Sequence, residues 1–138
     1  MVRTLGRFAV GGAFGAVVCI LAVGAVFADD EKKPTDVSTI MIKGHGKSGY
    51  LNKIKDGVKT EKWDDIAKAA KELKAFGEDL GKNVPEKGEA DSWKMLSEAY
   101  KKSTADVAAA VEKKDAKAAN EALGKIGKSC GSCHNKHK

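Results

Sequence analysis

Apolar side chains recur at helical spacing in four successive stretches of this chain, with lysines and acids on the opposite faces. The positions are Val37, Ile40, Met41, Leu51, Ile54 and Val58; Trp63, Ile66, Ala67, Ala70, Leu73, Phe76, Gly77 and Leu80; Trp93, Leu96, Ala99, Tyr100, Thr104, Val107 and Val111; and Ala119, Ala122, Leu123, Ile126 and Gly127. Such spacing is typical of amphipathic helices. Four of them joined by short loops predict an all-α, antiparallel four-helix bundle.

Capping residues and loop residues divide these stripes. A side chain that accepts a hydrogen bond from the first free N–H groups favours a helix start. The expected starts are Thr35 or Asp36, Thr60, Asp91 or Ser92, and Asp115. We expect the second helix to end at Gly81, before a loop over residues 83–88, and the third to end at Lys113 and Lys114.

The first stretch contains a glycine-rich gap, Gly44-His45-Gly46 followed by Gly49. Each glycine inside a helix costs about 1 kcal/mol relative to alanine. Two interpretations follow: the helix is broken here, or a bulky group presses against its backbone.

The last stripe runs directly into Cys130-Gly131-Ser132-Cys133-His134. Cys-x-x-Cys-His is the attachment signature of a c-type haem, in which two thiols bond the haem and the histidine binds iron. On a helix the three side chains fall within a sector of roughly 100°. The motif therefore predicts one covalent haem c near the C-terminus of the fourth helix, attached through Cys130 and Cys133 with His134 as the proximal ligand. We expect this site on the core face of that helix.

Three other interpretations of this segment are weaker. Cys130, Cys133, His134 and His137 are ligand types that zinc uses, although their spacing is tighter than the usual pairs. A thioredoxin-like dithiol normally follows a strand, and the pattern contains none. A disulfide as a staple would close a small loop and add little stability. We expect His137 to be exposed near the chain end.

The N-terminus has the pattern of an export signal. Arg3 and Arg7 precede an apolar run from Phe8 to Phe27, and Ala28 suits cleavage after it. The expected organisation is a signal peptide over residues 1–28, a flexible lead over 29–34 and the haem domain over 35–138. Left uncleaved, the apolar run would be long enough for a membrane anchor; Cys19 within it is interpreted as an apolar filler. Export agrees with the haem motif, because c-type haem is attached outside the cytoplasmic membrane.

Composition narrows the function further. The formal net charge is +6, with acids interleaved among the lysines throughout. Surfaces that bind nucleic acids have a more concentrated patch of basic residues, so no nucleic-acid binding is predicted. The excess of positive charge favours acidic partners, although the simpler interpretation is that the lysines form solvent-exposed helix faces. The chain shows no convincing nucleophile–base pair and its carboxylates are scattered, so no enzyme activity is predicted.

With the haem motif at the end of the last of four helices, residues 35 to 138 resemble the class II c-type cytochromes, the cytochrome c′ and cytochrome c556 group. In the c556 branch a methionine early in the first helix is the sixth iron ligand, and Met41 matches that place. Many members carry an arginine one turn earlier, near a haem propionate. Here Asp36 and Val37 stand in that region, so the propionate partner stays unassigned.

The sixth ligand has rivals. His45 follows Met41 by one helical turn and would give a bis-histidine site, or it is simply a surface histidine. Met41 itself is otherwise a core methionine. In the cytochrome c′ branch the sixth position is open. Trp63, Trp93 and Tyr100 are interpreted as core or haem-packing aromatics, and Tyr100 is a weak candidate for a propionate partner.

The predicted function is therefore one-electron transfer by an exported, periplasmic monohaem cytochrome, through Fe(III)/Fe(II), with redox proteins as partners. The alternative is a cytochrome c′-like protein that binds nitric oxide or carbon monoxide at an open sixth site; a zinc or dithiol protein is less favoured. The resemblance also implies a homodimer as one expectation, since relatives often pair through their first two helices.

Overall fold

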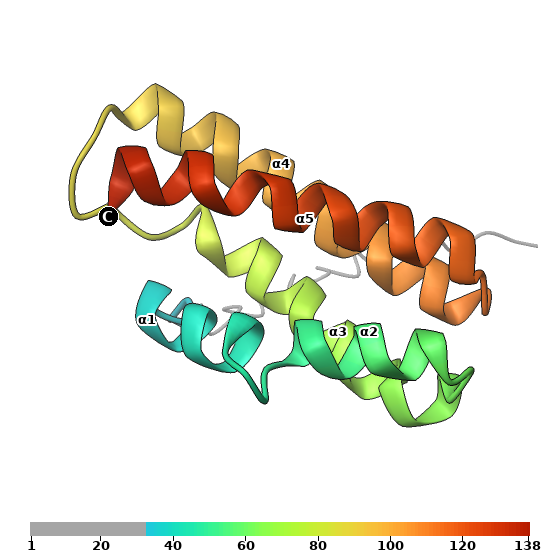
Figure 1. The fold of residues 1–138 in the computed structure, drawn as a ribbon. Coiled ribbons are helices and arrows are strands. Elements are labelled where there is room, and N and C mark those ends of the chain that lie inside the picture. The colour runs from blue at the N-terminus through green and yellow to red at the C-terminus, as the bar shows by residue number, and fades with distance from the viewer. Residues whose placement is uncertain (1–32) are drawn as a thin grey trace, which may run out of the picture. The chain divides into compact units, whose positions relative to one another are not determined.

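The computed structural model describes residues 33–138, which form an all-helical unit (Figure 1). Its elements are α1 (Val37–Thr39), the π-helix η1 (Ile40–His45), α2 (Tyr50–Lys59), α3 (Trp63–Leu80), α4 (Ala90–Glu112) and α5 (Ala116–His137). The expected signal peptide with Arg3, Arg7, Cys19 and Ala28, and most of the expected lead, lie outside the described residues. No helix within 33–138 combines the length and apolar character needed to cross a membrane.

The helices close into a bundle around one core. α3 packs against both α2 and α4, and α5 packs against both α4 and α2. Successive helices run in opposite directions along the bundle, as Figure 1 shows from the green α2 to the red α5. Within the described part of the chain there is no strand. The all-α four-helix bundle predicted from the apolar stripes is thus confirmed.

The predicted apolar stripes form the core. Its largest fully buried side chains come from every principal helix: Ile40, Ile54, Leu73, Ile126, Val107 and Thr104. Two predicted positions are wrong, because Ala99 and Gly127 are exposed. Both are small and lie at the margin of their stripes, where periodicity assigns a face least sharply.

The first predicted helix is interrupted at its glycine-rich gap. η1 ends at His45, Gly46 has an extended ψ of 169°, and α2 begins only at Tyr50. The break interpretation is therefore confirmed. A side chain also approaches the backbone just before the break, since a Cβ added to Gly44 would lie 3.3 Å from a ring carbon of Phe76. The bulk at that glycine is an aromatic ring of α3.

Two predicted helix starts are confirmed by their hydrogen bonds. The Asp36 carboxylate accepts from the Thr39 N–H at 2.9 Å, and the Asp115 carboxylate accepts from the Ala118 N–H at 2.9 Å. α1 and α5 thus begin where a carboxylate satisfies a free backbone donor.

The other two starts are corrections. Thr60 does not cap α3: its hydroxyl donates to the Asp56 carbonyl at 2.9 Å and closes the C-terminal end of α2. Threonine can serve either end of a helix, so composition alone assigned it wrongly. α4 begins at Ala90, just ahead of the expected Asp91 or Ser92.

Candidate haem site

The haem-attachment motif lies in the last turns of α5. Cys130 and Cys133 are partly buried free thiols, and Cys133 packs against the core. The Cys130 thiol donates a hydrogen bond to the carbonyl of Ile126, one helical turn earlier in α5, at 3.2 Å. His134 is exposed. The expectation of a core-facing site thus holds for the two thiols, whereas the imidazole stands at the edge of the core.

Two cavities meet at this motif. The larger, about 280 Å³, opens between η1, the loop after α3 and the end of α5; the smaller, about 70 Å³, extends inward toward α4. Met41, Cys133 and His134 line both. The structure therefore brings Met41 of η1 to the same space as the α5 motif, although they stand far apart in the chain.

The inner cavity also holds a polar pair that joins η1 to α4. His45 and Tyr100 line it, and the His45 Nε2 atom lies 2.8 Å from the Tyr100 hydroxyl oxygen. The His45 Nδ1 atom is buried and has no hydrogen-bond partner within the described residues. His45 is thus not a surface histidine, and only one of its two ring nitrogens is hydrogen-bonded within the described residues. The Tyr100 hydroxyl is the partner of that nitrogen.

Burial sets the protonation of the groups around this cavity. It lowers the pKa of His45, with the positive charges of His134 and Lys55 acting in the same direction. Burial raises the pKa of the Tyr100 phenol, and negative charge on the nearby Cys130 sulfur would act in the same direction. Burial likewise raises the pKa of the Cys133 thiol. The pair is therefore a neutral imidazole and a neutral phenol near neutral pH.

His137 is buried, which corrects the expectation of an exposed side chain at the chain end. Its Nδ1 atom lies 2.9 Å from the Lys87 carbonyl oxygen, and its Nε2 atom lies 3.1 Å from the Ser92 hydroxyl. The ring meets Trp93 edge-on, with centroids 5.3 Å apart. Both ring nitrogens are thus engaged in holding the end of α5 to the start of α4 and the preceding loop.

The loop around His137 is shaped to approach it closely. Gly88 has a φ of 91°, in the left-handed region that favours glycine. A Cβ added there would lie 2.6 Å from the His137 Nδ1 atom. Both the backbone conformation and the contact with His137 therefore require glycine at this position.

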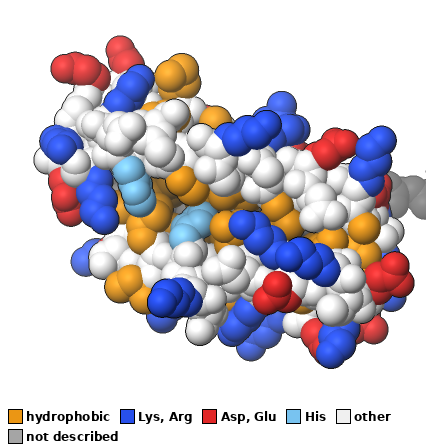
Figure 2. Space-filling model, viewed as in Figure 1, with side chains coloured by type: hydrophobic (Ala, Val, Ile, Leu, Met, Phe, Trp, Pro, Cys, Tyr) orange, Lys and Arg blue, Asp and Glu red, His pale blue; other side chains and the backbone are white. Residues whose placement is uncertain are grey.

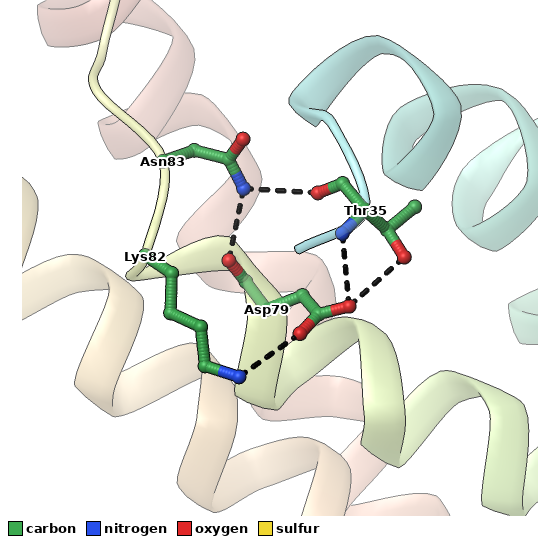
Figure 3. Close-up of polar contacts among 4 residues, drawn as sticks. All are labelled: Thr35, Asp79, Lys82 and Asn83. Carbon is green, nitrogen blue, oxygen red and sulfur yellow. Dashed lines mark hydrogen bonds and ion pairs between the residues drawn. The ribbon is translucent and has the colours of Figure 1, made fainter. Parts of the chain in front are cut away.

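A second polar cluster places α1 and η1 over α3 (Figure 3). The Asp79 carboxylate accepts from the Thr35 N–H at 3.0 Å and from its hydroxyl at 2.9 Å, and it pairs with Lys82 at 3.2 Å. The Asn83 side-chain amide donates to the Thr35 and Asp79 carbonyls, both at 2.9 Å. The segment that carries Met41 is thereby anchored just ahead of its first turn.

These residues fit a haem c. Two thiols project from one helix face into apolar cavities, an imidazole follows the second, and a thioether lines the same space from another element. His45, whose buried Nδ1 atom has no hydrogen-bond partner within residues 33–138, also lines the inner cavity. Figure 2 shows a face of the molecule on which histidine side chains lie among hydrophobic side chains, with lysines nearby.

The alternative zinc set is not brought together. Although His137 lines the outer cavity with Cys133 and His134, both of its ring nitrogens are engaged by Lys87 and Ser92. Across residues 33–138 no group of three or more His, Cys, Asp and Glu side chains is arranged to hold a metal ion.

Sequence reasoning missed two features of the site. The His45–Tyr100 pair joins residues that nothing in the sequence relates. The burial of His137 had a signal, because it stands one helical turn beyond Cys133 and so continues the inward face of α5. Its position near the chain end outweighed that signal in our interpretation.

The comparisons with known proteins agree with the motif. The family model described as Cytochrome C′ matches residues 88–138, which span the end of the loop after α3, α4 and α5. Neither the curated proteins nor the solved structures include a match to this chain. The C-terminal segment of the chain, which contains the attachment motif, is thus similar to cytochrome c′.

Proposed function

We propose that this chain, a c-type haem cytochrome related to cytochrome c′, is an exported monohaem electron carrier whose iron is bound by His134 and Met41. The haem supplies a one-electron Fe(III)/Fe(II) couple when bound. The observation that carries the proposal is that Met41 and His134 line the same two cavities from different elements. Cys130 and Cys133 hold the group covalently beside them.

The protein's own residues would set the potential of that couple. A thioether and an imidazole together favour a higher potential than two imidazoles, because the thioether stabilises Fe(II). The inner cavity is lined mainly by apolar side chains, including Met41, Leu80 and Leu96. Such a lining limits the access of water and so disfavours the more highly charged Fe(III) state.

The surface beside the outer cavity suits a protein partner. Ile42 and Val84 line its mouth and are 68% and 87% exposed. Lysines lie on this face, and without Arg3 and Arg7 of the expected signal peptide the formal net charge of +6 becomes 6 − 2 = +4. We expect a redox partner with an acidic surface, attracted at long range by these charges.

The test is the optical spectrum of the purified, exported protein in both oxidation states, with its intact mass. Haem that stays with the chain after denaturing extraction, and a mass matching a chain that begins after Ala28, would support covalent attachment and export. Sharp low-spin reduced bands would indicate six-coordinate iron. Broad high-spin bands that shift with carbon monoxide or nitric oxide would instead support the gas-binding alternative.

Matched methionine variants assign the sixth ligand. Met41→Ala should abolish the weak near-infrared band that arises from thioether-to-iron charge transfer, and it should lower the potential. Met95, on α4 and 62% exposed, is the control. Met95→Ala should leave the band and the potential as in the parent protein. If Met41→Ala does the same, Met41 is only a core residue.

A further inference from the structure

The Tyr100 hydroxyl and His45 Nε2 form a contact whose consequence goes beyond packing. The two atoms lie 2.8 Å apart, and the two rings are tilted by 49° with centroids 5.5 Å apart. Within the described residues this is the only hydrogen bond of the Tyr100 hydroxyl. Both side chains line the inner cavity with Met41 and His134.

His45 is placed to compete with Met41. The two side chains come from the same element, η1, and line the same cavity. A neutral imidazole is in general a stronger ligand for haem iron than a thioether. If both were equally free to move, His45 would therefore be expected to take the sixth position.

The two imidazole nitrogens differ in their ability to bind a haem iron. Nδ1 is bonded to the ring carbon that carries Cβ, so a flat macrocycle approaching it meets the side chain's own stem. Nε2 has only ring C–H groups beside it and is the unhindered ligand atom. Nε2 is the nitrogen that faces the Tyr100 hydroxyl, whereas Nδ1 has no hydrogen-bond partner among residues 33–138.

We propose that Tyr100 is a positioning residue that withholds His45 from the iron, so that the sixth position is left to Met41. This inference rests on the proposed function. Whichever of the two atoms donates the hydrogen, the in-plane position at Nε2 is occupied. Releasing it would leave a buried phenol hydroxyl, belonging to a side chain only 6% exposed, without a partner. Unpaired buried hydroxyls are strongly disfavoured, and this penalty keeps the pair together.

Tyr100→Phe in the haem-loaded protein tests the inference, because it removes only the hydroxyl and keeps the buried ring. The expected result is loss of the near-infrared thioether band, a low-spin spectrum of the bis-imidazole type and a lower potential. The double variant Tyr100→Phe/His45→Ala should regain the thioether band. Tyr50→Phe is the matched control, because the Tyr50 ring packs on Phe76; it should leave the spectrum unchanged.

Two outcomes would overturn the inference. One is a Tyr100→Phe protein with the spectrum and potential of the parent. The other is a changed spectrum that His45→Ala does not restore, since the effect would then not act through His45.

The parent spectrum tests the proposed function separately. A high-spin parent would contradict ligation by Met41. Tyr100→Phe would still test whether Tyr100 withholds His45: a low-spin spectrum that depends on His45 would support this, and an unchanged high-spin spectrum would overturn it.

Discussion

At the scale of single residues, the three histidines around the site differ in their surroundings and so in their expected roles. His134 belongs to the attachment motif, His45 faces Tyr100, and His137 holds the end of α5 to the loop before α4. The environment of each ring distinguishes them. His137 is 5% exposed with both nitrogens engaged, whereas His134 is exposed. A buried histidine with two partners has a structural role, and its loss should affect stability more than haem chemistry.

We therefore predict that His137→Ala lowers the free energy of unfolding by about 1–3 kcal/mol, because it removes two hydrogen bonds and the edge contact with Trp93 and leaves a void. Chemical denaturation of the haem-loaded protein measures it. The exposed neighbour Lys136 is the control, and Lys136→Ala should change stability by less than about 0.5 kcal/mol. Equal effects of the two variants would show that His137 contributes nothing specific.

At the scale of the elements, the packing of α3 on α4 depends on a missing side chain. Gly77 is buried in α3, and a Cβ there would collide with the Thr104 hydroxyl and approach the Lys101 Cα to 3.1 Å. The backbone of α4 leaves no room for this to relax. Gly77→Ala should therefore destabilise the protein by about 1–3 kcal/mol through overpacking.

Gly124 in α5 is the matched control. A Cβ added there would meet no atom within 4 Å, and the residue is exposed. Gly124→Ala should stabilise the helix by about 0.5–1 kcal/mol, since alanine is the better helix former. Thermal unfolding of the two variants should thus show shifts of opposite sign. Shifts of the same sign would contradict the close approach of α3 and α4.

The difference between local patterns and contacts among distant residues explains what the sequence could predict. Helical periodicity reports which face is buried, so the helices, the bundle and most core positions followed from it. Helix ends depend on single hydrogen bonds that several residues could supply, and Thr60 was therefore assigned to the wrong helix. The match of residues 88–138 to a cytochrome family agrees with the attachment motif. The His45–Tyr100 contact depends on how η1 and α4 are brought together, which no local pattern encodes.

At the scale of the whole molecule, the cavity lined by Met41 and His134 lies at an end of the bundle where polar contacts join several chain segments. Asn83 links them: its side chain donates to the Thr35 carbonyl, and its own carbonyl accepts from the Trp93 indole N–H at 2.8 Å. Together with Asp79 and His137, these contacts join the start of the described chain, the end of α3, the start of α4 and the end of α5. The walls of the cavity thus come from segments tied together by hydrogen bonds as well as by apolar packing.

This arrangement predicts a response to acid. Partial burial of Asp79 opposes ionisation, but the hydrogen bonds from Thr35 and the pairing with Lys82 outweigh it, so the pKa of Asp79 lies below 3.8. A carboxylate with a depressed folded-state pKa stabilises the fold fully above its unfolded value, and this contribution is lost as the pH falls through the folded value. Asp79→Asn should thus destabilise the protein near neutral pH, and the difference from the parent should shrink below pH 3.8.

Denaturant unfolding of the haem-loaded parent and variant across this pH range measures the effect. Asp106, which is exposed on α4 and makes no hydrogen bond or ion pair within residues 33–138, provides the control. Asp106→Asn should leave the stability near neutral pH close to that of the parent. A constant difference between parent and Asp79→Asn at every pH would show that the ionised carboxylate does not strengthen this end of the bundle. The tie between Thr35 and α3 would then depend on hydrogen-bond geometry alone, which the asparagine amide oxygen can also provide.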